Sequence, residues 1–165
     1  MKKLFEKYRE IIMYLIFGVL TTAVGFGTYF ILLLGAERVL GLEDGQPAYN
    51  IARVIAQILQ WVLAVLFAYF TNKKFVFRAG EGNEAKRLTS FFASRLFSLG
   101  ADSLVTFGTI WLLTIFSYQP FATRFGFLPF TLTFTADLWG KLAAAVVVIV
   151  LNYILSKFIV FRKVD

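Results

Sequence analysis

Hydrophobic residues along the chain fall into four long runs that are separated by short polar segments. The runs cover about residues 11–34, 48–71, 90–116 and 134–156. Each is long enough to cross a bilayer as a helix, which takes roughly 20 mainly apolar residues. The first run is uncharged, and it is too long for a signal peptide and lacks a small-residue cleavage site after it. The pattern therefore predicts four transmembrane helices.

Composition supports this prediction and narrows the classes of function. The 165 residues are 59% hydrophobic and 16% charged, whereas soluble domains are roughly 45–50% apolar and about 25% charged. We therefore expect an all-α integral membrane protein. The chain has no Cys and no His, so we expect no metal site, no disulfide and no imidazole acid–base chemistry. With short loops that carry no paired acids, the sequence predicts neither an enzyme nor a cofactor.

Basic residues concentrate on one side of the four runs. Twelve of them lie in three segments on this side: Lys2, Lys3, Lys7, Arg9, Lys73, Lys74, Arg78, Lys86, Arg87, Lys157, Arg162 and Lys163. The segments on the other side hold only Arg38 and Arg124. Because loops rich in Lys and Arg stay in the cytoplasm, we predict a multi-pass protein of the cytoplasmic (inner) membrane with both termini inside. These span ends account for most of the net charge of +7, so no nucleic-acid partner is expected.

The second and fourth runs end in similar sequences. At a shift of 84 residues, Tyr69, Lys73, Val76, Phe77 and Arg78 fall on Tyr153, Lys157, Val160, Phe161 and Arg162. The first and third runs match less well, through Phe-Gly-Thr at 26–28 and 107–109, and a chance match of aromatic-rich spans stays open there. The pattern predicts two tandem two-helix repeats, at about 8–78 and 88–163. They share one orientation because each has an even number of spans.

These motifs resemble those of a known family. The second run has Trp61 in its middle and ends in Asn-Lys-Lys-Phe-Val-Phe at 72–77; the fourth carries Lys141 and ends in Asn-Tyr-x-x-Ser-Lys-x-x-Val-Phe at 152–161. In these features the chain resembles the GtrA-like family of small four-helix membrane proteins, as a single domain over 1–165. The resemblance implies movement of a polyprenyl-phosphate-linked sugar, or of polyprenyl phosphate, for cell-envelope polysaccharide synthesis or glycosylation. It also implies a partner glycosyltransferase.

Polar and small residues recur along each run at alternating spacings of three and four, which places them on one face of each helix. Lipid cannot satisfy polar groups, so we expect these faces to point toward one another. The uncharged residues expected to line the resulting polar cavity are Thr21, Gln57, Gln60 and Asn152. Helix packing through small and polar residues is the other interpretation of the same pattern.

Five charged residues within the runs are the main candidates for a functional site: Arg53, Arg95, Asp102, Asp137 and Lys141. Each costs roughly 2.5–3.5 kcal/mol at a span centre, so they must pair or line a wet cavity. We expect Asp137 to pair with Lys141 one turn away, and Asp102 to serve Lys141 and Arg95 if the third and fourth helices are neighbours. The set is either an ion-pair network that holds the helices together or a path along which cations contact an anionic head group.

A further basic motif lies at the predicted cytoplasmic edge. Its residues are Asn72, Lys73, Lys74 and Lys157, and they are suited to gather the phosphate of a lipid. Contact with ordinary membrane lipid head groups, together with setting the orientation, is the other interpretation.

Three functions fit a small four-span protein with intramembrane charges. A translocator of polyprenyl-phosphate lipid needs a polar groove that is open to the bilayer, and four short spans are few for this, which favours a homo-oligomer. A non-transporting subunit that anchors or activates a glycosyltransferase explains the small size but gives the intramembrane charges no role beyond packing. A proton-coupled exporter of cations would favour an unpaired acid, whereas here cations accompany both Asp102 and Asp137. The sequence therefore favours the translocator.

Overall fold

The computed structural model describes residues 2–43, 45–80, 82–124 and 131–162, so Lys163 of the basic set lies outside the described residues. The elements are α1 (Lys2–Leu40), α2 (Pro47–Thr71), the π-helix η1 (Asn72–Val76), α3 (Glu84–Ile115), β1 (Phe121–Arg124), β2 (Thr131–Phe134), α4 (Ala136–Leu155) and the π-helix η2 (Ser156–Val160). Four helical segments among them are long and apolar enough to cross a membrane: Tyr8–Leu40, Pro47–Val76, Glu84–Ile115 and Ala136–Val160. The predicted four-span, all-α membrane class is confirmed.

The chain divides into two compact units. The first is built from Met1–Glu84 and the second from Ala85–Arg162. Each unit holds one pair of membrane-spanning helices and ends in a π-helical turn, and the two turns start 84 residues apart, at Asn72 and Ser156. The equivalence of the two units as tandem repeats stays a prediction.

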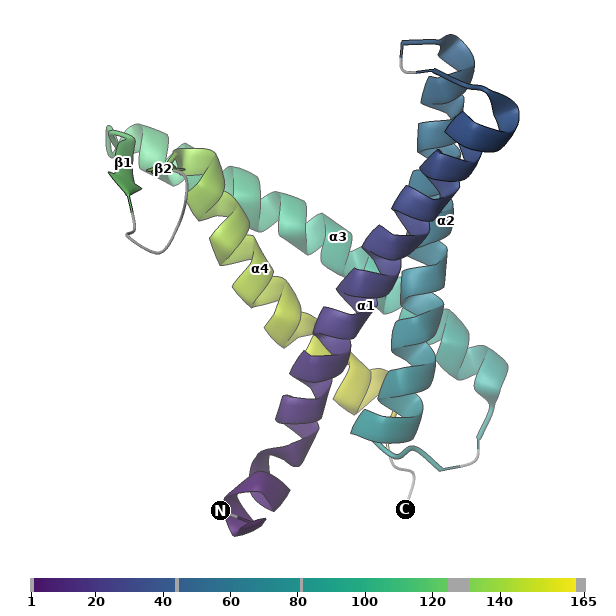
Figure 1. Ribbon diagram of the computed structural model, residues 1–165. Helices are drawn as coiled ribbons and strands as arrows, with labels where there is room; N and C mark the ends of the chain where they lie inside the picture. Colours follow the sequence, from purple (N-terminus) through teal and green to yellow (C-terminus); the bar gives the residue numbers. More distant parts are fainter. Residues whose placement is uncertain (1, 44, 81, 125–130, 163–165) are drawn as a thin grey trace. The chain divides into compact units, whose positions relative to one another are not determined.

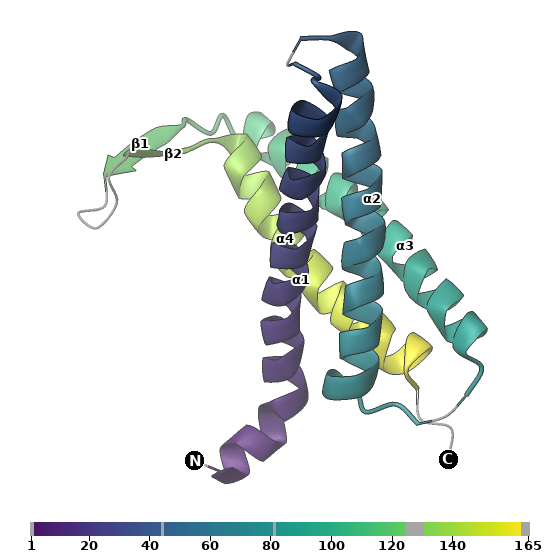
Figure 2. The same cartoon turned by 45° about the vertical axis from the view of Figure 1, so that its right-hand side comes forward.

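In the first unit, α1 and α2 run side by side in opposite directions (Figure 1, Figure 2). Helix α1 continues past the predicted span end at 34 to Leu40, where Gly41 takes a left-handed conformation (φ 62°) and the Leu42 N–H donates to the Ala36 carbonyl. This is the usual glycine-terminated close of a helix. Helix α2 then begins with Pro47 in its first turn, where the missing N–H has no helical partner in any case.

The two helices of the first unit approach closely at Gly25. A Cβ on this glycine would lie 2.8 Å from the Gln60 side-chain oxygen and 3.6 Å from the Ala64 Cβ. The small residue therefore makes room for the α2 amide, and Ala56, one turn before Gln60, is only 1% exposed. This contact supports the expectation that the polar faces of α1 and α2 meet at this level.

Both units end their last helix in a widened turn. The Phe77 N–H donates to the Asn72 carbonyl at 2.9 Å and the Phe161 N–H to the Ser156 carbonyl at 2.8 Å, five residues back rather than four. Such π-turns are rare and often accompany functional sites. Hydropathy carries no information on this widening, so the predicted ends at 71 and 156 fall where the α-helices change into the π-turns.

In the second unit, α3 and α4 are joined by side-chain contacts along their lengths. The Ser98 hydroxyl donates to the Asn152 side-chain oxygen at 2.8 Å, and the rings of Phe91 and Phe161 lie 5.9 Å apart. A Cβ on Gly140 would lie 2.9 Å from the Thr106 carbonyl oxygen, so the two backbones come very close there. The Thr135 hydroxyl caps the start of α4 by accepting the Leu138 N–H at 3.2 Å.

The segment between α3 and α4 contains a short hairpin that the sequence pattern did not predict. Strands β1 and β2 are antiparallel, with Phe121 opposite Phe134 and their rings stacked 4.9 Å apart. Tyr118 donates to the Phe134 carbonyl at 3.0 Å and accepts from the Trp139 indole at 2.9 Å. These aromatic contacts mark one end of the second unit, and rings with polar tips are typical of the membrane–water interface.

Candidate functional site

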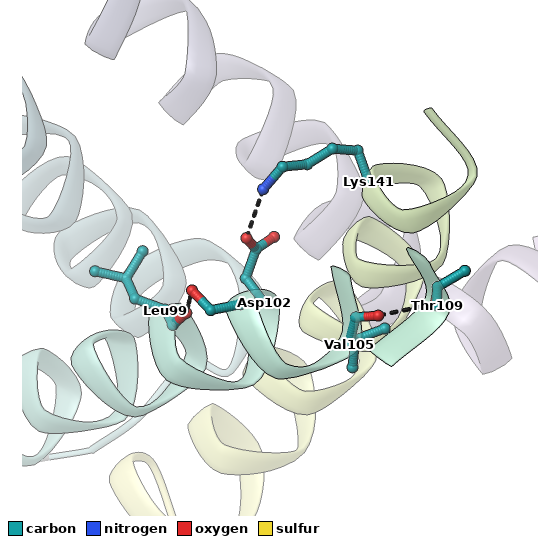
Figure 3. Close-up of polar contacts among 6 residues, drawn as sticks. Leu99, Asp102, Val105, Thr109 and Lys141 are labelled. Atoms are coloured by element: carbon teal, nitrogen blue, oxygen red, sulfur yellow. Dashed lines mark hydrogen bonds and ion pairs between the residues drawn. The ribbon is translucent and has the colours of Figure 1, made fainter. Parts of the chain in front are cut away.

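The clearest polar contact within the spans joins α3 to α4. The Lys141 ammonium lies 2.8 Å from a carboxylate oxygen of Asp102. The Lys141 side chain is 63% exposed and that of Asp102 is 32% exposed. Figure 3 shows Lys141 reaching from α4 to the carboxylate on α3. An ion pair that the chain leaves accessible at membrane depth requires water, another protein surface or a ligand beside it.

The direction of the Lys141 side chain is unusual for a lysine near an interface. Its neighbour Gly140 lies against Thr106, yet its ammonium binds Asp102, which lies one turn earlier on α3. The two contacts lie about 6 Å apart along α3, at 1.5 Å per residue. An isolated lysine would extend toward the water instead. The carboxylate of Asp102 holds the cation inside the span.

Most hydroxyl groups next to this ion pair satisfy themselves locally. Ser103 donates to the Leu99 carbonyl at 3.2 Å and Thr109 to the Val105 carbonyl at 2.8 Å (Figure 3). The Thr106 hydroxyl is buried without a hydrogen-bond partner in the described structure. Near the ion pair, the Thr106 hydroxyl therefore keeps unused hydrogen-bonding capacity, whereas the hydroxyls of Ser103 and Thr109 are bound within α3.

Of the charge pairings that the sequence allows, the one between Lys141 and Asp102 forms among the described residues and two others do not. Lys141 pairs with Asp102 and not with Asp137. Asp137 is exposed in the first turn of α4, where the helix dipole stabilises a carboxylate. Within the part of the chain that the structure describes, Arg95 makes no ion pair with Asp102; its guanidinium lies 4.6 Å from the centre of the Phe91 ring. A cation over an aromatic face is stabilised without an acid.

The expected polar residues of the first unit divide into two groups. Gln60 lies at the helix contact and Thr21 donates to the Phe17 carbonyl at 2.7 Å. Gln57 is exposed and lies about 100° around the helix from the buried Ala56, so its place in a polar cavity stays a prediction. Arg53 lies 4.8 Å from the centre of the Tyr49 ring, near the opposite end of α2 from the basic motif.

The basic motif at the end of α2 is well structured. Asn72 is buried, and Lys73 forms an ion pair with Glu84 at 2.8 Å. The Lys74 ammonium lies 5.4 Å from the centre of the Phe75 ring. In the second unit, the Lys157 ammonium donates to the Tyr153 hydroxyl at 3.2 Å. Asn152, an expected cavity residue, is buried and bound to Ser98.

Sequence reasoning missed several partners of these groups. Glu84 accepts from the Tyr69 hydroxyl at 2.8 Å, Glu37 accepts from Tyr49 at 2.6 Å, and Arg9 donates to the Phe75 carbonyl at 2.7 Å. The two glycines at 80 and 82 signal a chain reversal that brings Glu84 back to Lys73, whereas nothing in the pattern pairs Arg9 with a carbonyl 66 residues away.

No group of three or more acidic residues within the described ranges is arranged to hold a metal ion. The cations described above can recognise an anion through ionic contacts and hydrogen bonds. Cations of this kind bind phosphate strongly, because hydrogen bonds between ionised groups are about twice as strong as neutral ones.

Comparisons with known proteins agree with one another. Residues 13–161 match the family described as GtrA/DPMS, transmembrane domain. The chain is 34% identical over 160 residues to the cell wall teichoic acid glycosylation protein GtcA of Listeria monocytogenes, covering 95% of this chain and 88% of that protein. It is 32% identical over the same shares to the GtcA protein of Listeria innocua. It is 31% identical over 154 residues to the membrane protein YwcD of Bacillus subtilis, covering 92% of this chain and 95% of that one.

Proposed function

The chain belongs to the GtrA/DPMS transmembrane-domain family, and from this premise we propose that it moves a polyprenyl-phosphate-linked sugar, or polyprenyl phosphate itself, across the cytoplasmic membrane. The lipid would serve the glycosylation of a cell-wall polymer, in keeping with the teichoic acid glycosylation named for its relatives. A glycosyltransferase that uses the sugar is the proposed partner. The excess of basic residues on one side favours cytoplasmic termini.

The observation that carries the proposal is the exposed Lys141–Asp102 pair. A cation held inside a span by a carboxylate can exchange that carboxylate for the phosphate of a lipid. In both states the charge of Lys141 is compensated, which avoids leaving a bare cation at low dielectric. The phosphate of a lipid-linked sugar could thereby enter the membrane without carrying its own counter-ion.

The surroundings of the pair suit a lipid ligand. An apolar cavity of about 570 Å³ lies between the same two helices, with Leu113, Trp139, Leu142 and Val146 in its lining. It offers a place for part of a hydrocarbon chain near the aromatic end of the second unit. Four spans enclose little volume, so a homo-oligomer is proposed as the transporting form.

The experiment is reconstitution of the purified chain in liposomes without any glycosyltransferase. A fluorescent polyprenyl-phosphate sugar and fluorescent polyprenyl phosphate are loaded in one leaflet, and their appearance in the other leaflet is followed by quenching with dithionite. We expect crossing that is at least about tenfold faster than in empty liposomes and that Lys141→Ala abolishes. A protein that folds and inserts but moves neither lipid would contradict transport and favour the non-transporting subunit that activates a glycosyltransferase.

A further inference from the structure

Contacts from α1 hold the turn at the end of α2 in an ordered conformation. Widening of the helix to a π-turn exposes carbonyl groups, and the Arg9 guanidinium of α1 donates to the Phe75 carbonyl at 2.7 Å and to that of Val76 at 3.5 Å. The Phe17 ring stacks on Phe75 with centres 5.2 Å apart. We call residues 72–79 the basic turn. Its shape is fixed by these contacts before any ligand arrives.

The basic turn gathers three cations around one open cavity. The cavity has a volume of about 470 Å³ and is lined by Phe70, Lys73, Lys74, Arg78 and Ala79. Arg78 takes a left-handed conformation (φ 48°), and the Ala79 N–H closes the turn on the Lys73 carbonyl at 3.0 Å. Glycine usually occupies such a position. A strained residue with a charged side chain is more typical of a binding site than of a structural cap.

The charges in this cavity do not balance. Lys73, Lys74 and Arg78 supply three positive charges, and Glu84, bound to Lys73 at 2.8 Å, supplies one negative charge. The excess is two positive charges. A phosphate monoester carries about −1.5 to −2 at pH 7, whereas a phosphate diester carries a single negative charge. The cavity therefore matches a monoester better than a diester.

The cavity is also partly apolar and lies at the end of a membrane span. Phe70 is 60% exposed and Phe75 is 41% exposed beside the three cations. Exposed aromatic rings next to basic side chains suit a ligand whose charged group continues into a hydrocarbon chain. A free phosphate ion would leave the exposed parts of these rings uncovered.

We propose that the basic turn binds the phosphate monoester head group of a membrane lipid, and that Glu84 occupies Lys73 until the lipid displaces it. The inference rests on the proposed function for the identity of the natural lipid: polyprenyl phosphate is a monoester, whereas its sugar-linked form is a diester. The basic turn is thus a site for the bare carrier at the edge proposed to face the cytoplasm.

The first test measures lipid binding to the purified full chain by native mass spectrometry. Phosphatidic acid and phosphatidylglycerol with identical acyl chains supply a monoester and a diester, and inorganic phosphate supplies the head group without a lipid. We expect phosphatidic acid and polyprenyl phosphate to bind at least about fivefold more tightly than phosphatidylglycerol, and inorganic phosphate to compete only weakly. Equal binding of the two phospholipids would overturn the proposal, and so would inorganic phosphate binding as tightly as phosphatidic acid.

Matched variants test whether the cavity is the site. Lys73→Gln and Arg78→Gln should each weaken phosphatidic acid binding about tenfold, since each removes a charge-assisted contact. Glu84→Gln should tighten it about two- to fivefold, because an exposed competing ion pair is lost while the new amide can still accept from Tyr69. Lys86→Gln is the control: it removes one charge on the same side of the chain, at an exposed position outside the cavity lining, and should leave binding unchanged.

The outcomes separate this inference from the proposed function. If Lys86→Gln weakened binding as much as Lys73→Gln, general surface charge would explain the binding and the basic turn would not be a specific site. Glu84→Gln guards against a folding defect, since a misfolded variant cannot bind more tightly. Monoester binding that is tight in the wild type but lost in Lys73→Gln supports the inference even if no lipid crosses the liposome membrane, which would overturn transport alone.

Discussion

Lys141 offers a way to separate an ion pair that only stabilises the protein from one that also exchanges with a ligand. We expect Lys141→Asp and Asp102→Lys each to lower the melting temperature and to reduce lipid crossing about tenfold or more, since each brings two like charges together. Combining the two reverses the pair, whose groups lie 2.8 Å apart in the wild type. The double variant should regain most of the lost thermal stability but not the transport, because the cation then projects from α3.

Thermal unfolding in detergent and lipid crossing in liposomes measure the two effects. The wild type and the conservative variant Lys141→Arg, which keeps the cation on α4, serve as controls. If the charge-reversed double variant recovered transport together with stability, the pair would have a structural role alone.

Arg78 carries the second prediction at this scale. Its φ of 48° costs an L-residue roughly 1–2 kcal/mol, and glycine does not bear this cost. Arg78→Gly should therefore stabilise the protein by about 1 kcal/mol even though it removes a charge. Arg78→Gln keeps the strain and should leave stability nearly unchanged, while both variants lose binding of a lipid phosphate monoester. Thermal melts of the two variants that coincided would show that the turn is not strained at Arg78.

At the scale of elements, two glycines at helix contacts should respond differently to the same substitution. A Cβ at Gly140 would lie 2.9 Å from the Thr106 backbone carbonyl, whereas a Cβ at Gly25 would lie 2.8 Å from the mobile end of the Gln60 side chain. Backbone cannot move aside as a side chain can. Gly140→Ala should therefore destabilise the protein by about 1–3 kcal/mol, and Gly25→Ala by much less.

Gly108→Ala is the control for both, because nothing lies within 4 Å of the Cβ that it adds. In this variant the gain in helix propensity, about 0.5–1 kcal/mol, should remain visible as a slight stabilisation. Differential scanning calorimetry of the three variants in the same detergent measures these changes in stability. A Gly140→Ala protein as stable as the Gly108→Ala protein would mean that α3 and α4 separate easily at this contact.

The elements also show which parts of the fold the sequence predicts. Hydropathy finds the four spans because burial in lipid is a property of each segment alone. It misses the extension of α1 to Leu40, since Glu37 and Arg38 end the apolar run but not the helix. The hairpin pairing Phe121 with Phe134 depends on contacts across the chain, which no local pattern contains.

The residues of the candidate site were predicted from the sequence, and their pairing was predicted in part. Periodicity places Asp102 and Lys141 on the polar faces and allows them to pair if α3 and α4 are neighbours, whereas local spacing also allows Asp137 as the partner, and the pair that forms joins the two helices. The way α3 crosses α4 decides this, and a sequence pattern does not contain it. Gln57 does not lie at the helix contact for a related reason: the contact with α1 uses the side of α2 that carries Ala56 and Gln60.

On the scale of the whole molecule, the two units contain the same kind of turn with different side chains. Both end in a π-turn closed by a phenylalanine N–H. The turn of the first unit has Lys74 where that of the second has Phe158, and Glu84 pairs with Lys73 in the first while Tyr153 contacts Lys157 in the second. If the units derive from tandem repeats, the turn of the first unit has the greater capacity to bind an anion.

The orientation of the whole chain gives the last prediction. Twelve basic residues lie on one side against two on the other, and from the positive-inside rule we predict that the basic turn lies in the cytoplasm. Single cysteines test this cleanly, because the chain has no Cys of its own. Glu43→Cys lies on the side proposed to be outside and Gly82→Cys on the side of the basic turn; both positions are exposed. Gly45 is avoided because its φ of 93° would strain a cysteine.

An impermeant maleimide added to intact cells should label the cysteine at position 43 and leave the one at position 82 unlabelled until the cells are opened. The control is labelling of both variants after permeabilisation, which shows that each thiol is reactive. Labelling at position 82 in intact cells would reverse the orientation. The basic turn would then face outward, and it would meet the bare carrier only where that lipid is released outside. The order in which the carrier and the sugar-linked carrier visit the basic turn and the Lys141–Asp102 pair would then be inverted.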